Sequence, residues 1–529
     1  MTLLSKFLIP TLALTAFVGN GICGAQSPAF NSGWARGIEG QRKADLGDGT
    51  YLNPVLAGDR PDPSVIKHGS DYYMVHSSFG SVPGLLVWHS RDLVSWEPVG
   101  PALTQNVGIV WAPDISFRNG RFYIYFPVLN DRGFTNMVVS AADIKGPWTI
   151  PVDLKVPNFD PGFATDSEGK GYLFFNGGNM VPLADDGLTV AGEVKHVYDG
   201  WPIPEHWQIE TFAQEGPKLL RHGDYYYMVL AEGGTAGPAT SHMVIMARSK
   251  SMNGPWENSP YNPVVRTQSA VEKWWSRGHA TLLEGPDSKQ WYLVYHAYEN
   301  GYYNLGRQTL LEPVEWTADG WVKSLGYDVS KPIPMPSGGE PLQHGYALSD
   351  DFSTDRIGTA WTFFMQPGNY RDRYRYEDGT LVLKAQGSTP RDASPLELVC
   401  GDHAYEVEVE VDADAGATGG LLLFYSEKLF AGMGISESQM IEYRKGDITT
   451  FPKPQGLGRH YFLRIRNDHN FMTIWHSQDG VNWARHWMHI EVSGYNHNTA
   501  DGFLSLRPAL LAAGKGEVRF RNFKYSVLP

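Results

Sequence analysis

The chain has 529 residues and a formal net charge of −13, with 42% hydrophobic and 19% charged residues. These values suit a globular protein of two or three domains and exclude a disordered chain. The negative charge disfavours nucleic acid as a partner but allows a neutral one. Aromatic residues reach 13%, which suits both β structure and a sugar site, where flat rings pack against C–H groups.

Residues 1–25 have the features of an export signal. Lys6 precedes an apolar stretch, 7–18, that is too short to span a bilayer, and Cys23-Gly24-Ala25 offers small residues for cleavage before Gln26. A lipoprotein signal is the alternative because of Cys23, although the residues before this cysteine fit that motif poorly. We therefore expect a secreted or periplasmic protein.

Cys400 is the one cysteine that remains after removal of the signal. A single cysteine forms neither an intramolecular disulfide nor a cysteine-cluster metal site, so we expect a buried, inert thiol. No other stretch of 18 apolar residues occurs, and we expect no membrane contact once the signal is removed.

Residues 48–335 contain a repeat of short strand patterns. Five segments combine a polar turn with aromatic and β-branched residues, and they recur about every 50 residues. The tyrosines that mark them are Tyr73, Tyr123, Tyr172, Tyr226 and Tyr292. Four-stranded units of this length are typical of a β-propeller, so we predict five blades. A pair of β-sandwiches with coincidental spacing is the alternative.

The pattern changes after the repeat. Proline and glycine are frequent around residue 336, so we expect a linker over 336–345, in addition to an N-terminal linker over 26–47. Within 346–529, apolar and polar residues alternate, as in 405–411 and 461–466. Because such alternation gives one buried and one solvated face, we predict a β-sandwich and an all-β protein.

The repeat also indicates which residues are equivalent. About a dozen residues before the marker tyrosines stand Asp62, Asp160, Glu215 and His279, and the second repeat has Ala112 there, with Trp111 and Asp114 beside it. Equivalent positions of a propeller face one axis, so three carboxylates are predicted to converge. Each acid stands next to Pro or Gly, so the alternative is that these are ordinary turns capped by acids.

Converging carboxylates have a chemical consequence. Like charges in a desolvated pocket cannot all stay ionised, so the pKa of one of them rises. Cleavage of a glycosidic bond needs such a protonated acid for the leaving oxygen and an ionised base for water. Because blades one and four are not neighbours in a five-bladed ring, we expect Asp62 and Glu215 to leave room for that water, and hence inversion.

Several motifs, in this order, resemble glycoside hydrolase family 43 and cover nearly all of residues 50–325. They are residues 53–68, Trp111-Ala112-Pro113, Phe159-Asp160-Pro161-Gly162, Glu215-Gly216-Pro217, Gly278-His279-Ala280 and Gly306-Arg307-Gln308. The resemblance implies an inverting enzyme on a five-bladed propeller. It implies Asp62 as general base, Glu215 as general acid and Asp160 as the residue that tunes and orients the acid. The chain after residue 345 resembles the concanavalin-like sandwich of xylosidase-type members.

Further site residues follow from the same resemblance. Arg307 stands where members place a substrate-contacting arginine, and His279 where they keep a histidine near the channel centre, sometimes beside an ion. Trp111 is a candidate sugar platform. The alternatives are a surface ion pair, a satisfied core histidine and blade packing, respectively. We expect that no cofactor is required, with a structural calcium at Asp350 and Asp351 as an option.

The sequence therefore predicts an exported, exo-acting, inverting glycosidase with a neutral oligosaccharide substrate. The resemblance implies action on xylose or arabinofuranose units of hemicellulose, and β-xylosidase is preferred because the sandwich resembles that of xylosidases. An α-L-arabinofuranosidase is the alternative. The rival from another class is a non-catalytic carbohydrate-binding propeller, which we would expect to lack one of the three acids.

Overall fold

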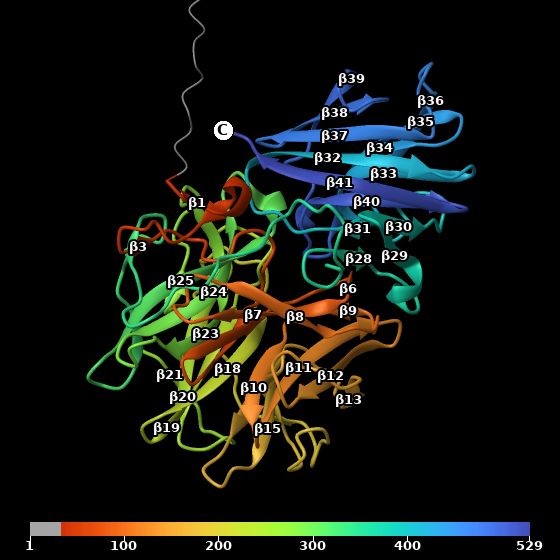
Figure 1. Cartoon of the computed structure of the whole chain (residues 1–529). Helices are drawn as coiled ribbons and strands as arrows, with labels where there is room; N and C mark the ends of the chain where they lie inside the picture. The colour runs from red at the N-terminus through yellow and green to blue at the C-terminus, as the bar shows by residue number, and fades with distance from the viewer. Residues whose placement is uncertain (1–32) are drawn as a thin grey trace, which may run out of the picture. The chain divides into compact units, whose positions relative to one another are not determined.

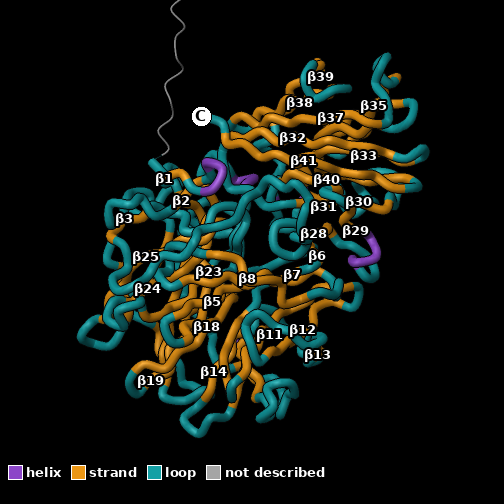
Figure 2. The backbone as a smooth tube through the Cα atoms, viewed as in Figure 1, coloured by secondary structure: helices purple, strands orange, loops and turns teal. Residues whose placement is uncertain are grey.

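The computed structural model describes residues 33–529 (Figure 1). The predicted export signal lies outside the described residues. Strands form almost all of the regular structure (Figure 2). The helices of the described part are single turns, η1 (Ile38–Gly40), η2 (Asn176–Gly178), η3 (Tyr303–Leu305), η4 (Tyr370–Arg373) and α1 (His497–Ala500). None of them is long and apolar enough to cross a membrane.

Five antiparallel sheets follow one another along the chain and confirm the predicted five-bladed propeller. Blade I has β4 (Ser64–His68), β5 (Asp71–Val75), β7 (Gly84–Ser90) and β8 (Glu97–Leu103), and blade II has β9 (Ile109–Val110), β10 (Asp114–Arg118), β11 (Arg121–Asn130), β12 (Gly133–Ala141) and β13 (Val152–Asp153). Blade III has β14 (Gly162–Thr165), β15 (Gly171–Phe175), β16 (Asn179–Pro182) and β17 (Lys195–His196).

The last two blades complete the ring. Blade IV has β18 (Gln214–His222), β19 (Tyr225–Glu232), β20 (Met243–Ser249), β21 (Glu257–Asn258) and β22 (Val265–Arg266), and blade V has β23 (Trp274–Glu284), β24 (Trp291–Glu299), β25 (Arg307–Trp316) and β26 (Val322–Ser324). The strands β4, β10, β14, β18 and β23, one from each blade, contact one another in that order, and β23 contacts β4. These five strands therefore surround one axis.

The ring is closed by the chain on either side of it. Strand β3 (Thr50–Tyr51) pairs with β27 (Ile333–Pro334), and Leu56 forms an isolated bridge with Thr309 of blade V. Apolar side chains fill the spaces between neighbouring sheets, as Leu85 and Val87 of blade I do with Ile124 of blade II. Packing of this kind removes apolar area from water and fixes the blades relative to one another.

The C-terminal part forms two stacked antiparallel sheets, as the alternating pattern predicts. In spatial order, the first contains β36 (Asp447–Pro452), β35 (Gln439–Arg444), β34 (Leu429–Ile435), β33 (Ala417–Ser426), β40 (Arg507–Gly514), β31 (Leu396–Glu397), β28 (Thr362–Phe364) and β6 (Ser81–Val82). The second contains β29 (Tyr374–Glu377), β30 (Thr380–Lys384), β41 (Glu517–Val527), β32 (Ala404–Ala413), β37 (His460–Asp468), β38 (Phe471–Ser477) and β39 (Trp483–Glu491).

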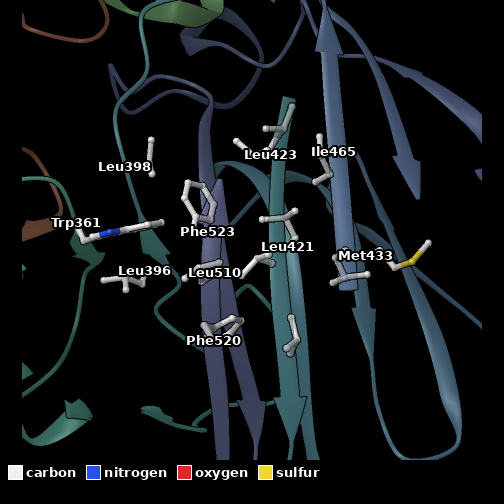
Figure 3. Close-up of a cluster of buried hydrophobic side chains, with 14 of the residues drawn as sticks. Trp361, Leu396, Leu398, Leu421, Leu423, Met433, Ile465, Leu510, Phe520 and Phe523 are labelled. Atoms are coloured by element: carbon white, nitrogen blue, oxygen red, sulfur yellow. The ribbon is translucent and has the colours of Figure 1, made fainter. Parts of the chain in front are cut away.

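The core of the sandwich lies between these sheets (Figure 3). In β32, Val407, Val409 and Val411 are fully buried while the glutamates between them face outward. Leu421 of β33 and Phe520 of β41 bring the two sheets into one apolar cluster. The period of two in the sequence thus matches one buried face per strand.

Two segments behave differently from the sequence expectation. Strand β6 lies within the propeller sequence, yet it pairs with β28 and becomes the edge of a sandwich sheet. Residues 33–47, expected as part of a linker, form a hairpin of β1 (Ala35–Arg36) and β2 (Arg42–Lys43). The hairpin is anchored because the buried Arg42 guanidinium lies 2.8 Å from Glu299 and its backbone N–H donates to Asp402.

A buried ionic network joins propeller and sandwich. Arg507 of β40 lies 2.9 Å from Asp59, before blade I, and 2.6 Å from Glu397 of β31. All three side chains are buried, so removing one would leave an uncompensated charge. The carboxylates proposed for calcium are engaged by protein donors: Asp350 accepts from Trp361 Nε1, and Asp351 accepts from Ser353.

Candidate active site

One cavity at the axis of the propeller is lined by all six residues singled out in the sequence. It has a volume of about 500 Å³ including its mouth, and the six residues are Asp62, Trp111, Asp160, Glu215, His279 and Arg307. They come from all five blades or from the segments that enter them. The structure therefore brings together in space what the repeat placed far apart in the chain.

The backbone at this ring of positions explains how the side chains are aimed. Asp62, Asp160 and His279 all have left-handed φ values, of 56°, 55° and 56°. In blade IV the equivalent residue is Gly216, with φ of 60°, because β18 and β19 meet at His222 and Tyr225 in the same register as the turn of blade I. The equivalence predicted for Glu215 is thus wrong by one residue.

Glu215 nevertheless lines the cavity, because the pairing of β18 with β19 shifts between Glu215 and Lys218. Such a bulge redirects side chains that strict alternation would separate. Glycine is required at position 216, since a Cβ there would lie 2.5 Å from His279 Nε2. The repeat thus provides the ring of positions, and the bulge provides the acid at one of them.

Asp62 is held as a carboxylate by a cation. Arg307 Nη1 lies 2.8 Å from Asp62 Oδ1, Ser77 Oγ donates to Oδ2 at 2.5 Å, and His279 Nδ1 lies 3.3 Å from Oδ1. Burial raises the pKa of Asp62, but the charge of Arg307, supported by His279 and His296, outweighs it and holds the pKa well below its ordinary value. Asp62 is therefore ionised across the working pH range.

His296, which the sequence analysis did not single out, fixes the backbone at the same place. Its Nδ1 lies 3.0 Å from the backbone N of Asp62 and 3.1 Å from Asp62 Oδ1, and its Nε2 lies 3.2 Å from Thr235 Oγ1. Burial, aided by Arg307, lowers the pKa of His296 to about 4, and the ring is neutral at pH 7. It positions Asp62 without adding a charge.

The pKa values of the other two carboxyl groups, Glu215 and Asp160, are shifted in the opposite direction. Burial, followed by the charge of Asp62, raises the pKa of Glu215 to about 7. Burial, followed by the charges of Glu215 and Asp62, raises the pKa of Asp160 well above its ordinary value. Asp160 Oδ2 also accepts the N–H of Gly216 at 3.1 Å, which ties it to the residue next to Glu215. The cavity thus holds one ionised carboxylate beside carboxyl groups that retain protons near neutral pH.

Lys218 braces the blades under these groups. Its Nζ donates to the carbonyl of Pro113 at 2.8 Å and lies 3.1 Å from Asp114 Oδ1. Asp114 also accepts from Ser64 Oγ and from the backbone N–H of Phe163, both at 2.8 Å. One buried ion pair therefore connects blades I to IV.

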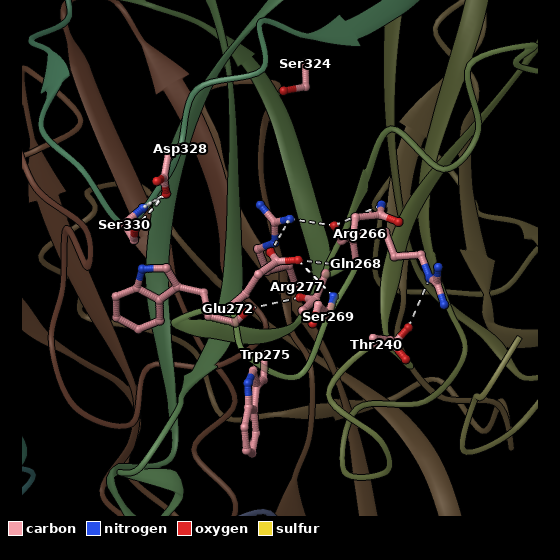
Figure 4. A network of polar contacts seen from close by, with 12 residues as sticks. Thr240, Arg266, Gln268, Ser269, Glu272, Trp275, Arg277, Ser324, Asp328 and Ser330 are labelled. Atoms are coloured by element: carbon pink, nitrogen blue, oxygen red, sulfur yellow. Dashed lines mark hydrogen bonds and ion pairs between the residues drawn. The ribbon is translucent and has the colours of Figure 1, made fainter.

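Polar contacts also anchor the start of β23, the strand that carries His279 (Figure 4). The Arg277 guanidinium donates to the carbonyl of Arg266 and lies 3.4 Å from Glu272. Glu272 in turn accepts from the N–H groups of Gln268 and Ser269. These contacts thus fix the N-terminal end of β23.

An aromatic wall closes one side of the cavity. Phe503, from the sandwich, faces Phe79 of the propeller at 6.5 Å between ring centroids, and the Arg307 guanidinium lies over both rings. Trp111 packs edge-on against Phe134 and Phe503, so its ring both packs and lines the cavity. Phe79 and Phe503 do not belong to the repeated pattern, and nothing in the sequence indicated a role for them.

Ligand atoms of Glu215, His242 and His279 lie within 4.8 Å of one another, a spacing at which a metal ion could bind. Both ring nitrogens of His242 are buried and have no hydrogen-bond partner among the described residues. Neutral imidazoles with one carboxylate suit a first-row metal better than calcium, which prefers oxygen ligands.

A propeller whose axis holds an ionised carboxylate beside a carboxyl group of raised pKa defines the site of a glycosidase. Comparison with known proteins agrees with this class. Residues 51–322 match the model of glycosyl hydrolases family 43, and the chain belongs to this family.

Relatives and solved structures point the same way. The chain is 32% identical over 360 residues to a protein of Bacteroides ovatus named non-reducing end α-L-arabinofuranosidase BoGH43B, covering 64% of this chain and 66% of that one. It is 33% identical over 314 residues to a Vibrio protein named xylan 1,3-β-xylosidase, covering 51% and 56%. It thus spans between half and two thirds of these relatives. The crystal structure of the GH43 BlXynB protein from Bacillus licheniformis superposes with a TM-score of 0.79 at 28% identity, covering 90% of this chain and all of that one.

Proposed function

We propose that this protein is an exo-acting, inverting glycosidase that removes terminal xylose or arabinofuranose from xylan or arabinoxylan oligosaccharides. The observation that carries the proposal is the difference between two carboxyl groups of one cavity. Asp62 is ionised beside Arg307, and the pKa of Glu215 is raised to about 7.

In the proposed mechanism, Glu215 donates its proton to the glycosidic oxygen while Asp62 removes a proton from the attacking water. The C–O bond to the leaving group breaks as the bond from water to the anomeric carbon forms, so the configuration inverts. Asp160 accepts the N–H of Gly216 and so fixes the backbone next to Glu215, which orients the acid. Arg307 keeps the base ionised and lines the cavity in which the substrate would bind.

Exo action is supported by the aromatic wall. Phe503 of the sandwich lines the same cavity as the acids, and a closed side suits binding of a chain end. The sandwich would then contribute directly to substrate selection.

We favour xylose as the released sugar, in line with the relatives of Bacillus subtilis and Vibrio that are named β-xylosidases. Arabinofuranose is the second candidate, because the Bacteroides ovatus relative is named an arabinofuranosidase. We also propose export, on the apolar segment after Lys6. N-terminal sequencing of the secreted protein should begin at Gln26.

The test is a panel of aryl β-xylosides and α-L-arabinofuranosides with the wild type and Glu215→Gln. We expect turnover of one panel by the wild type, with the variant still binding the oligosaccharide but not hydrolysing it. Binding without turnover by the wild type would favour the non-catalytic rival. We expect no cofactor requirement, so dialysis against a chelator should leave activity unchanged, whereas a loss restored by added metal would point to the Glu215, His242 and His279 cluster.

A further inference from the structure

A fourth carboxylate lines the catalytic cavity and has no part in the proposed mechanism. Glu210 precedes β18 and is exposed, yet it borders the same cavity as Asp62 and Glu215. The repeat does not reach it, and the sequence analysis did not single it out. A carboxylate at the mouth of a sugar site calls for a physical account, because it faces both solvent and substrate.

The backbone around Glu210 is built to hold it. Its Oε2 accepts hydrogen bonds from the N–H groups of Ala236 at 2.7 Å and Gly237 at 3.0 Å. Its own N–H donates to the carbonyl of Gly233 at 3.0 Å and to Ser241 Oγ at 2.7 Å. Side chain and main chain are thus fixed at the same time, which is how a binding residue is pre-organised.

Two glycines make room for this side chain. A Cβ on Gly234 would lie 2.6 Å from Glu210 Oε2, and one on Gly237 would lie 2.5 Å from Glu210 Cβ. Contacts that close leave no space for any other residue at 234 or 237 without moving the carboxylate. The loop after β19 therefore packs closely around Glu210 and fixes its side chain.

The second oxygen of the carboxylate is unused. Oε1 of Glu210 has no hydrogen-bond partner, and no cation pairs with the side chain, within the part of the chain that the structure describes. A carboxylate oxygen is purely an acceptor, and hydroxyl groups are the donors that a sugar supplies. A fixed acceptor at the cavity edge therefore suits a polyhydroxylated group.

Glu210 enters the cavity from the same blade as the acid, because it stands five residues before Glu215 on the segment that leads into β18. After burial and the charges of Asp62 and Arg307, its charge contributes to the pKa of Glu215, and it also acts on Tyr303 and on His497 of the sandwich. It does not stand among the main charges acting on Asp62. Since the general acid protonates the departing oxygen, this is the side on which the leaving group is held.

We propose that Glu210 determines specificity for the leaving group: its free oxygen accepts hydrogen bonds from the hydroxyls of the sugar that departs. The inference rests on the proposed function, because it assigns the acid's side of the site. It predicts that loss of the Glu210 carboxylate affects a sugar leaving group more than an alcohol that lacks further hydroxyls.

The experiment compares two substrates with the same terminal sugar, a disaccharide and the corresponding methyl glycoside. Both leaving groups are alkyl alcohols that depart only when the acid protonates them, and only the disaccharide offers further hydroxyls to Glu210. Each variant is compared with the wild type on the same substrate, which removes the difference in leaving-group basicity. Measurements at pH 5.5, below the pKa of Glu215, keep the acid protonated in every variant. We expect Glu210→Gln and Glu210→Ala to lower kcat/KM for the disaccharide by about 10- to 100-fold, the effect of losing a charge-assisted hydrogen bond.

For the methyl glycoside we expect less than about a threefold change. Gly237→Ala should reproduce the selective loss by displacing the carboxylate, and Glu205→Gln, on the same loop but outside the cavity lining, should change neither substrate. Equal losses on both substrates, or no loss on either, would overturn the inference while leaving the proposed function intact. A wild type that hydrolyses neither substrate would overturn both.

Discussion

Arg307 and Asp62 form a buried ion pair, 2.8 Å from Nη1 to Oδ1, at the axis of the propeller. The guanidinium stabilises the ionised form of Asp62. Burial raises the pKa of Glu215, and the negative charge that remains on Asp62 raises it further. Arg307 thus helps to keep Asp62 ionised while Glu215 retains its proton, and the proposed activity depends on this difference in protonation.

Asp62→Asn should lower kcat on an aryl xyloside or arabinofuranoside by about 10²- to 10⁴-fold, because the variant cannot take a proton from water. Circular dichroism should show a retained fold. Asp71→Asn, on the same blade but paired with His89 and Arg91 at the surface, serves as the control and should stay within about twofold. Full activity of Asp62→Asn would remove Asp62 from the mechanism.

The pH profile should have one limb in the accessible range. Glu215 must be protonated to act, and its pKa is raised to about 7, so kcat/KM should be flat below about pH 6 and fall tenfold per unit above about pH 7. The pKa of Asp62 lies well below its ordinary value, so kcat/KM should not fall at acidic pH before the protein unfolds. Steady-state kinetics from pH 4 to 9 measure this. A limb that persists in Glu215→Gln would belong to another group.

Phe503→Ala should weaken the substrate interaction although the residue belongs to the sandwich. Loss of a partly buried aromatic contact beside Arg307 and Trp111 corresponds to about 10- to 100-fold in kcat/KM. Phe471→Ala, an exposed sandwich phenylalanine, is the control and should have no effect. If both variants behave like the wild type, the sandwich does not shape the site.

Glu232 should make stability depend on pH. Burial raises the pKa of Glu232 to about 7, against the opposing hydrogen bond from the Trp201 N–H. The folded state therefore holds a proton that the unfolded state releases near pH 4.5, so the free energy of unfolding falls as the pH rises from about 4.5 to 7. Glu232→Gln should remove up to about 3 kcal/mol of this fall. Urea denaturation at pH 5 and 8 tests it, with exposed Glu193→Gln as the control, which should retain the wild-type fall; an undiminished fall in Glu232→Gln would exclude Glu232 as its source.

The sequence was informative where the fold repeats and silent where it does not. Asp62, Asp160 and His279 occupy equivalent positions, so counting along the chain was enough to bring them together. Glu215 was found by the same count but with an error of one residue, because the residue of blade IV that corresponds to Tyr73 is Tyr227 and not Tyr226. These positions express backbone geometry, which recurs from blade to blade.

The repeat could not indicate three further residues that line the cavity, Phe79, Glu210 and Phe503. They stand on connecting segments whose course depends on long-range packing, and Phe503 comes from a separate sheet system more than 400 residues from Phe79 in the chain. The pairing of β6 with β28 was missed for the same reason, since strands of two and three residues carry no readable period.

The anomer first formed from an aryl glycoside, followed by proton NMR before mutarotation, measures the mechanism itself. Water activated by Asp62, attacking as Glu215 protonates the departing oxygen, gives a product of inverted configuration. A product of retained configuration would mean a covalent intermediate and would contradict both the base role of Asp62 and the acid role of Glu215 in a single displacement.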